Sequence, residues 1–362
     1  MKEYPIPMVP GPVSVPREVL AAYQHNFGSP DLEPEFLELY NQTETRIQQI
    51  MKTKNKIVIH SGEGMIALWG ALKSCLKTDD KVLSLATGVF GYGIGEMAKS
   101  IGAQVKTVGF PYNETLHNWD KIEKAIIEFH PKIVTAVHCE TPSGTLNPIQ
   151  KLGELKTKHK VPLLYVDVVA SVGGTEVDCD DWQIDLALGG SQKAFSAPPE
   201  MSFLAVSPKA WEIIEEVNYV GYDALLPFLN AQENFYFPYT PSWHGVAALN
   251  AAAGMILDEG LNAVFARHDQ VAGYMRQQLQ TLGYELFPDP SAIPSPTVSA
   301  VLIPENQTWV EFDAELRKSG LVVGGSYGPL AGKVFRLGHM GSQANMSLAH
   351  QALDVLESVR KK

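Results

Sequence analysis

Short apolar runs recur along the first part of the chain and alternate with stretches of helical periodicity. The apolar runs lie at 56–60, 82–86, 133–139, 162–168, 184–189 and 202–206. The helical stretches between the first five runs lie at about 64–77, 91–101, 119–129 and 148–160. Because each run is continuously apolar rather than alternating, it is typical of a strand buried on both faces. The pattern therefore predicts an α/β fold with a mostly parallel sheet between helices.

The two ends of the chain differ from this central region. A proline-rich N-terminal arm at 1–16 precedes helices expected at 17–27 and about 31–52. Beyond about residue 207 the alternation stops, and the segment 218–245 is rich in aromatic residues and proline. After it we expect helices at 246–258, 260–282, 308–319 and 345–360, and strands near 284–287, 297–303 and 334–338.

These regions suggest a division into three parts. We interpret 1–16 as an arm, 17–258 as a large α/β domain and 259–362 as a smaller α+β domain. A chain of 362 residues is long enough for a large domain and a smaller one.

Composition and charge exclude several classes of protein. Hydrophobic residues make up 45% and charged residues 19%, as in an ordinary globular protein. No stretch reaches the roughly 18 uncharged apolar residues of a membrane span. The net charge of −11, without a Lys/Arg-rich tract, disfavours nucleic-acid binding. The cysteines Cys75, Cys139 and Cys179 share no close spacing, so we expect no disulfide framework, no metal site and a cytoplasmic location.

Two residues with chemical potential follow neighbouring predicted strands. Asp167 closes the run at 162–168, and Lys193 follows the run at 184–189 within GGSQKAFSAPP. Taken alone, Asp167 is most simply a turn residue and Lys193 a surface lysine. Parallel strands would place both at the same edge of the sheet. There the lysine could form a Schiff base with an aldehyde cofactor, and the aspartate could keep a pyridine nitrogen protonated.

The segment VDVVASVGGTEVDCDDWQIDLALGGSQKAFSAPPEMS resembles the core signature of class V aminotransferases of the alanine–glyoxylate and serine–pyruvate type. Further similar segments, in the same order along nearly the whole chain, are PGPVSVPREVL, TGVFG, ETPSGTLNP, YTP, GLNAVFARH and FRLGHMG. The resemblance implies a fold-type I enzyme with a mostly parallel seven-stranded sheet and a smaller C-terminal domain. It also implies pyridoxal 5′-phosphate as cofactor.

Residue roles follow from this resemblance for the matching positions only. Lys193 is expected to form the Schiff base and to move the proton, and Asp167 to pair with the pyridine nitrogen. Phe90 and Val169 are expected on the two faces of the ring, and Thr141 at its 3-hydroxyl.

The resemblance also implies residues for the cofactor phosphate and the substrate. Gln192 and Thr240 match positions that hold the phosphate, and the threonine comes from a neighbouring subunit, so a homodimer is implied. Arg336 is expected to bind the carboxylate of a small amino acid or 2-oxo acid.

The turn that would cradle the phosphate departs from the family. Ser61, Gly62 and Glu63 open the sequence SGEGM, where the alanine–glyoxylate type usually reads SGSGT. A carboxylate about 4 Å from a phosphate would cost roughly 1–4 kcal/mol per charge pair. One interpretation is that Glu63 only caps its helix. The other is that the ring bound here has no phosphate and serves as substrate.

One branch of the family, the pyridoxamine–pyruvate transaminases, fits the second interpretation. The similarity includes PYNE at 111–114, FPYTPS at 237–242 and GHMG at 338–341. Two positions depart from that branch, because it tends to have asparagine at Gln192 and arginine at Tyr327, a candidate substrate-binding residue. Two alternatives remain open: an ordinary pyridoxal-phosphate alanine/serine–glyoxylate (pyruvate) aminotransferase, and a vitamin B6-binding protein without catalysis.

Overall fold

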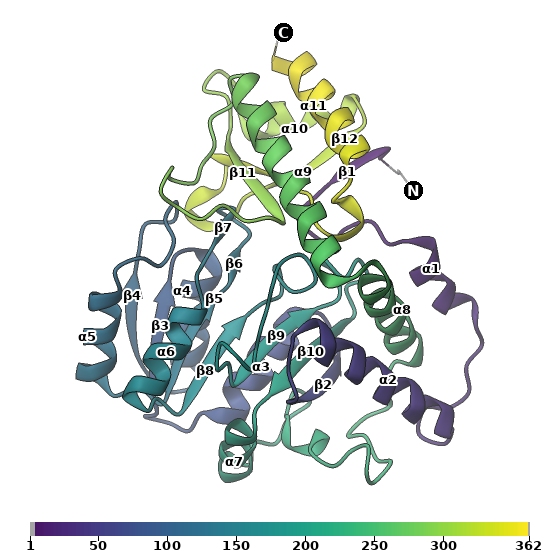
Figure 1. Ribbon diagram of the computed structural model, residues 1–362, viewed down its shortest axis with the longest axis vertical. Coiled ribbons are helices and arrows are strands. Elements are labelled where there is room, and N and C mark those ends of the chain that lie inside the picture. Colours follow the sequence, from purple (N-terminus) through teal and green to yellow (C-terminus); the bar gives the residue numbers. More distant parts are fainter. Residues whose placement is uncertain (1–3, 361–362) are drawn as a thin grey trace.

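The computed structural model describes residues 4–360 and is built around a seven-stranded sheet. The strand order is β2-β10-β9-β8-β5-β3-β4. The strands are β2 (Lys56–Ser61), β3 (Lys81–Ala86), β4 (Gln104–Gly109), β5 (Ile133–Val137), β8 (Leu163–Asp167), β9 (Leu186–Gly190) and β10 (Met201–Val206). Only β10 runs antiparallel to its neighbours in this sheet. The expected α/β fold with a mostly parallel sheet is confirmed (Figure 1).

Helices cover this sheet on both faces. They are α2 (Pro34–Ile50), α3 (Gly64–Cys75), α4 (Val89–Ser100), α5 (Trp119–Phe129), α6 (Gln150–His159), α7 (Pro208–Val217) and α8 (Trp243–Glu259). The chain moves along the sheet in one direction through α3 and α4, and in the other through α5 and α6. Because such crossovers are right-handed, α3 and α4 share one face and α5 and α6 the other.

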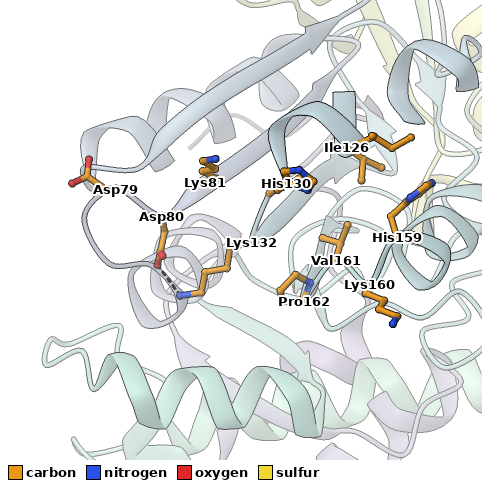
Figure 2. A pocket seen from close by; sticks show the side chains of 12 residues that line it. Asp79, Asp80, Lys81, Ile126, His130, Lys132, His159, Lys160, Val161 and Pro162 are labelled. Carbon is orange, nitrogen blue, oxygen red and sulfur yellow. Dashed lines mark hydrogen bonds and ion pairs between the residues drawn. The ribbon is translucent and has the colours of Figure 1, made fainter. Parts of the chain in front are cut away.

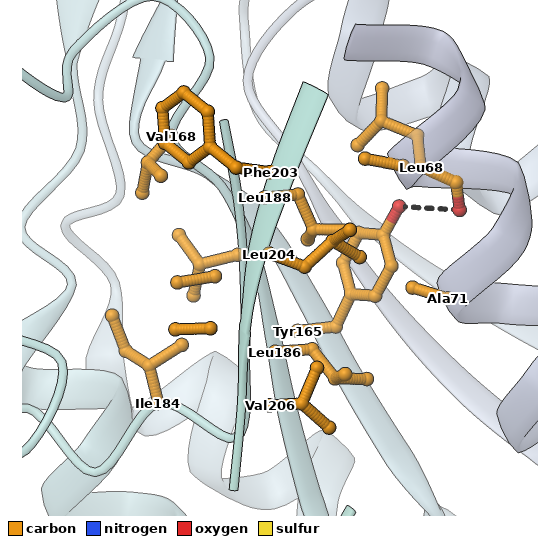
Figure 3. Close-up of a cluster of buried hydrophobic side chains, with 14 of the residues drawn as sticks. Leu68, Ala71, Tyr165, Val168, Ile184, Leu186, Leu188, Phe203, Leu204 and Val206 are labelled. Atoms are coloured by element: carbon orange, nitrogen blue, oxygen red, sulfur yellow. Dashed lines mark hydrogen bonds between the residues drawn. The ribbon is translucent and has the colours of Figure 1, made fainter. Parts of the chain in front are cut away.

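A buried cluster joins α3 to the middle of the sheet (Figure 3). Tyr165 of β8 packs here against Leu68 and Ala71 of α3, while Val168, Ile184 and Phe203 lie on the other side of the strands. Tyr165 is fully buried in this cluster, and its hydroxyl donates to the carbonyl oxygen of Leu68 at 3.0 Å. This packing fixes the direction of α3, whose first turn lies at the candidate site.

The C-terminal part forms a second layer with its own core. Its four-stranded sheet has the order β1-β12-β13-β11. The elements are β1 (Ile6–Met8), β11 (Val298–Leu302), β12 (Leu321–Gly325) and β13 (Val334–Gly338), with helices α9 (Leu261–Thr281), α10 (Trp309–Lys318) and α11 (Met346–Arg360). β1 belongs to the N-terminal arm and pairs in parallel with β12. The arm is therefore part of this sheet, while the division at residue 258 stays a prediction.

The remaining elements are short helices and strands. They are α1 (Arg17–Leu20), η1 (Ala21–Gln24), β6 (Cys139–Glu140), β7 (Thr145–Leu146), η2 (Leu226–Phe228), η3 (Gly328–Leu330) and η4 (Gly341–Gln343). The prediction of a strand near 284–287 is wrong. Only Leu286 forms a β-bridge there, to Val301, and two prolines follow that have no N–H group to continue the strand pairing. None of the helices within residues 4–360 is both long and apolar enough to cross a membrane.

The Tyr165 hydrogen bond offers a test of the core packing. Tyr165→Phe keeps the ring but removes the buried hydroxyl, so we expect a loss of about 0.5–1.5 kcal/mol of unfolding free energy. Chemical denaturation measures the change, with Tyr222→Phe, at a 61% exposed tyrosine, as control. Equal stability of the two variants would contradict the packing described for Tyr165.

Candidate active site

The predicted site residues converge at the carboxyl edge of the seven-stranded sheet. β2, β9, β8, β5 and β3 run in the same direction, so the loops after them meet at this edge. The candidate residues lie at or shortly after the ends of these strands: Ser61, Gly62 and Glu63 for β2, Gln192 and Lys193 for β9, Asp167 and Val169 for β8, Thr141 for β5, and Phe90 for β3. The expectation that Asp167 and Lys193 share one edge is met, and their individual roles remain predictions.

Lys193 is held beneath the N-terminal arm. Its Nζ donates a hydrogen bond to the carbonyl oxygen of Pro10. Gly11 has a φ of +93°, and a Cβ atom there would lie 2.5 Å from Lys193 Cδ, so this crossing requires glycine. Burial, together with the charge of Arg336, lowers the pKa of Lys193 to about 8. A large fraction of the amine is therefore neutral and nucleophilic near pH 8.

Asp167 ends β8 with a buried carboxylate. Its Oδ1 accepts the N–H of Val169 at 2.9 Å. Burial raises the pKa of Asp167 to about 6, while the Val169 N–H and the charge of Lys193 act in the opposite direction. The carboxylate is thus mainly ionised at neutral pH, as is required to pair with a protonated pyridine nitrogen.

The turn between β2 and α3 has the geometry of an anion cradle but contains its own carboxylate. Gly62 turns the chain with a φ of +127°, and α3 begins at Gly64. Glu63 occupies the N-cap position, yet its side chain accepts no N–H group of the first turn. Instead, Glu63 Oε2 accepts a hydrogen bond from Gln192 Nε2 at 3.1 Å. Hydrogen-bond capping of α3 therefore does not account for Glu63.

Gln192 is oriented by this contact. Because Glu63 Oε2 accepts this bond, Gln192 turns its NH₂ group to Glu63 and its Oε1 away. Within the described residues, this buried Oε1 has no hydrogen-bond partner. A Cβ atom at Gly190 would lie 2.7 Å from Oε1 and 3.3 Å from Val169 Cγ1, so both groups border the same glycine. The amide oxygen of Gln192 is thus buried beside Gly190 without a hydrogen-bond partner among the described residues.

Phe90 and Thr141 are connected through Glu140, to which the sequence analysis assigned no role. The fully buried Glu140 carboxylate accepts the N–H groups of Phe90 at 3.2 Å and Gly91 at 2.7 Å. Thr141 follows it directly and is 2% exposed. The available signal was a glutamate at the end of an apolar run, directly before TPSGT.

Arg336 lies on β13, with 3% of its surface exposed. Its Nε and Nη2 atoms both donate to the carbonyl oxygen of Gly325. The ring of Tyr327 lies 4.7 Å from its guanidinium carbon, and burial lowers the pKa of Arg336. Among residues 4–360 no carboxylate forms an ion pair with Arg336, although buried charges are usually paired. A substrate carboxylate would supply that charge.

The arm connects the strand of Arg336 to Lys193. Gln343 is fully buried and donates to the carbonyl oxygens of Val9 at 2.8 Å and Gly338 at 2.6 Å. Its Oε1 accepts the N–H of Ser14 at 3.1 Å. Arg336 precedes Gly338 by two residues on β13, and Pro10 follows Val9. Gln343 therefore links β13 to the segment of the arm whose Pro10 carbonyl accepts the Lys193 hydrogen bond.

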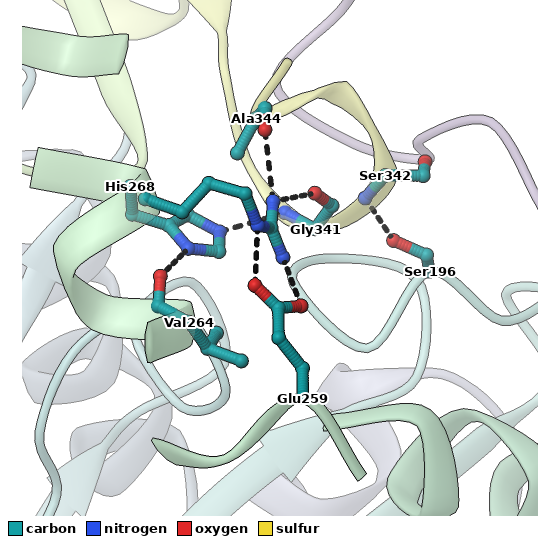
Figure 4. A network of polar contacts seen from close by, with 8 residues as sticks. Ser196, Glu259, Val264, His268, Gly341, Ser342 and Ala344 are labelled. Carbon is teal, nitrogen blue, oxygen red and sulfur yellow. Dashed lines mark hydrogen bonds and ion pairs between the residues drawn. The ribbon is translucent and has the colours of Figure 1, made fainter. Parts of the chain in front are cut away.

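A second network fixes the loop after Lys193 to the C-terminal part (Figure 4). Ser196 Oγ accepts the N–H of Ser342 at 2.8 Å, and His268 Nε2 accepts the N–H of Gly341 at 2.9 Å. Arg267 pairs with Glu259 and donates to the carbonyl oxygens of Gly341 and Ala344. These bonds hold the two parts of the chain together behind the candidate site.

Thr240 is exposed in the single chain described. Its hydroxyl donates to Asp31 Oδ2 at 3.3 Å. The preceding Tyr239 contacts the cradle, since its hydroxyl accepts the N–H of Ser61 at 3.3 Å. The predicted role of Thr240 involves a second subunit and stays a prediction. No group of three or more potential metal ligands occurs among the described residues.

A separate cavity of about 590 Å³ lies at the amino edge of the sheet (Figure 2). Lys81 begins β3 there, and Lys132 pairs with Asp80 at 2.7 Å just before β5. This edge is opposite to the carboxyl ends that carry Asp167 and Lys193. The cavity therefore lies apart from the candidate active site.

The known proteins that this chain resembles include aminotransferases. The family model described as Aminotransferase class-V matches residues 10–328. The pyridoxamine–pyruvate transaminase of Mesorhizobium japonicum is 33% identical over 97% of this chain and 90% of its own length. The alanine–glyoxylate aminotransferase of Oryctolagus cuniculus is 32% identical over 92% of this chain and 87% of its own. The crystal structure of pyridoxamine–pyruvate aminotransferase from Mesorhizobium loti has a TM-score of 0.94 and 30% identity, covering 100% of this chain and 94% of that one.

The fold and the comparisons together define an aminotransferase of fold type I. The chain belongs to the class-V aminotransferase family, whose members of this fold use pyridoxal phosphate. The amino donor and the acceptor do not follow from membership, because relatives named for different substrates have similar identities.

The low pKa of Lys193 leads to a pH prediction. Addition of pyridoxal to Lys193 requires the neutral amine, so covalent attachment should rise with pH through about 8. Arg336→Gln removes a nearby positive charge, which raises the pKa of Lys193 and moves the midpoint to higher pH. The absorbance of the attached ring measures this midpoint. Arg317→Gln on α10, whose charge does not act on Lys193, should leave it unchanged; a midpoint that also stays in place for Arg336→Gln would contradict the assignment.

Proposed function

We propose that this aminotransferase takes an unphosphorylated vitamin B6 ring as substrate, with pyridoxamine as amino donor and a small 2-oxo acid such as pyruvate as acceptor. The observation that carries the proposal is the hydrogen bond between Glu63 and Gln192. It engages one of the two N–H groups of the Gln192 amide and places a carboxylate at the end of the site where a phosphate would otherwise lie.

The hydrogen-bonding character of this end of the site supports a hydroxyl group. A phosphate dianion accepts hydrogen bonds and carries negative charge, so it needs donors and cations. The hydroxymethyl group of pyridoxamine can donate one bond, which matches the carboxylate of Glu63. The residues at the ring end fit a B6 ring, whereas those at the phosphate end fit a neutral hydroxymethyl group better than a phosphate.

The charges around the site support the same choice. Two carboxylates, Glu63 and Asp167, lie at this edge, together with the cations Lys193 and Arg336. Arg336 is assigned to the substrate carboxylate and lies on the C-terminal sheet. This leaves an acidic environment for the ring, which favours a ligand with protonated nitrogens and no phosphate.

Each residue has a distinct task in the proposed transfer. The bound ring acts as the electron sink that allows a proton to leave the carbon next to the transferred nitrogen. Lys193 takes up and returns that proton, which suits an amine with a pKa near 8. Asp167 keeps the pyridine nitrogen protonated, and Arg336 orients the carboxylate of the 2-oxo acid through its planar guanidinium.

A homodimer in the cytoplasm is the assembly we infer. Its support is a set of exposed apolar side chains on the segments around Thr240 and its neighbour Asp31. These are Leu20, Tyr23, Leu32, Val220, Tyr222 and Tyr236, exposed by 38–86%. In this assembly Thr240 of one subunit would reach the ring site of the other.

The function is tested by turnover and by the vitamer preference of a Glu63 variant. Purified protein should convert pyridoxamine and pyruvate without added phosphate cofactor, and Lys193→Ala should abolish this conversion. Glu63→Ser removes the carboxylate and releases the Gln192 amide, so affinity for pyridoxal 5′-phosphate relative to pyridoxal should rise about tenfold or more. Equilibrium binding of both vitamers measures this ratio.

Two outcomes would count against the proposal. Tight retention of pyridoxal 5′-phosphate, without turnover of pyridoxamine, would favour an ordinary alanine/serine–glyoxylate (pyruvate) aminotransferase. Turnover of neither pyridoxamine nor an amino acid would favour a vitamin B6-binding protein. Glu96→Gln, at an exposed glutamate of α4, is the matched control and should leave the vitamer ratio unchanged.

A further inference from the structure

Glu140 is a buried carboxylate for which the proposed transfer uses no chemistry. It ends β6 at the carboxyl edge of the sheet and is fully inaccessible to solvent. Within residues 4–360 it forms no ion pair, and burial raises its pKa to about 7. An unpaired buried carboxylate is costly, so its retention here needs a physical reason.

The reason lies in the first turn of α4. Glu140 Oε1 accepts the N–H of Gly91 at 2.7 Å, and Oε2 accepts the N–H of Phe90 at 3.2 Å. These N–H groups have no partner within the helix, and the positive end of the helix dipole stabilises a negative charge at this place. The first turn of α4 therefore stabilises the Glu140 carboxylate in place of a cationic side chain.

The glycines around Phe90 show how closely the helix fits this carboxylate. A Cβ atom at Gly88 would lie 2.6 Å from Glu140 Cδ, and one at Gly91 would lie 3.3 Å from Oε1. Both distances are shorter than ordinary van der Waals contact. The backbone on either side of Phe90 thus lies in close contact with Glu140. This contact fixes the position from which the Phe90 side chain projects.

Glu140 also fixes the loop that follows it. Its carbonyl oxygen accepts the N–H groups of Ser143 at 3.3 Å and Gly144 at 2.9 Å. Thr141 lies within that turn, and the charge of Asp167 acts on Glu140 from the end of β8. One residue therefore connects the start of α4, which carries Phe90, with the turn that contains Thr141.

We propose that Glu140 is a positioning residue for the B6 ring, which acts by holding Phe90 against the ring face through the first turn of α4. This inference rests on the proposed function only in that Phe90 contacts the ring. It is independent of whether the ring carries a phosphate, because Glu140 bonds the backbone of α4 and not the cradle at Glu63.

Glu140→Gln is the direct test, since it preserves volume but alters the hydrogen bonds. A carboxylate accepts through both oxygens, whereas an amide would turn its NH₂ group toward the N–H of Phe90 or Gly91. One of the two bonds is then lost. We expect affinity for pyridoxal and for pyridoxal 5′-phosphate to fall by the same factor, about tenfold. The induced circular dichroism of the bound ring should fall as well, because the ring is held less rigidly.

A double-mutant cycle with Phe90→Ala separates positioning from general damage. If Glu140 acts through Phe90, Glu140→Gln should cause little further loss of ring affinity in the Phe90→Ala protein. A full tenfold loss in that background, or unchanged affinity of Glu140→Gln alone, would overturn the proposal.

Glu140→Asp covers the case in which Glu140→Gln does not fold. It keeps the charge but withdraws the carboxylate by one methylene group, so the same equal loss for both vitamers is expected. Normal affinity and normal dichroism of this variant would overturn the proposal. A preference for the phosphorylated vitamer in all variants would contradict the proposed function but leave the role of Glu140 intact.

Discussion

The candidate site depends on one constraint: β8 and four other strands of the large sheet run in the same direction. β2, β9, β8, β5 and β3 all end at the same edge, so five separate loops can place side chains around one ring. The buried cluster between α3 and the sheet packs the first helix of this edge against the strands. At the same edge, the starts of α3 and α4 supply N–H groups and positive dipole ends. A carboxylate of the chain itself lies at each of these helix starts, that of Glu63 at α3 and that of Glu140 at α4.

The two carboxylates have different consequences. Glu140 bonds the first turn of α4 directly and so shapes the wall that carries Phe90. Glu63 makes no such bond and instead engages Gln192, which removes a donor from the phosphate end. The C-terminal sheet carries Arg336, the predicted binder of the substrate carboxylate, and Gln343 links its strand β13 to the arm that covers Lys193.

Much of this arrangement could be predicted from the sequence. Continuous apolar runs identified six strands of the large sheet, because each is buried on both faces. The seventh, β4, lies at the edge and has exposed positions, so QVKTVG lacks a continuous run. α7 was missed although Ser207 and Pro208 are typical helix-start residues. The resemblance assigned roles to Lys193, Asp167 and Arg336, which stay predictions, but none to Glu140 or Gln343. Their importance arises from tertiary hydrogen bonds to distant backbone, which no local pattern encodes.

The proposed function requires that Lys193 receives a B6 ring without a phosphate. The most direct measurement offers an equimolar mixture of pyridoxal and pyridoxal 5′-phosphate to the protein freed of bound vitamer. Borohydride then fixes whichever ring is attached, and peptide mass spectrometry identifies the adduct on Lys193. Our account predicts that the adduct without phosphate dominates at neutral pH. A dominant phosphorylated adduct on Lys193 would contradict it.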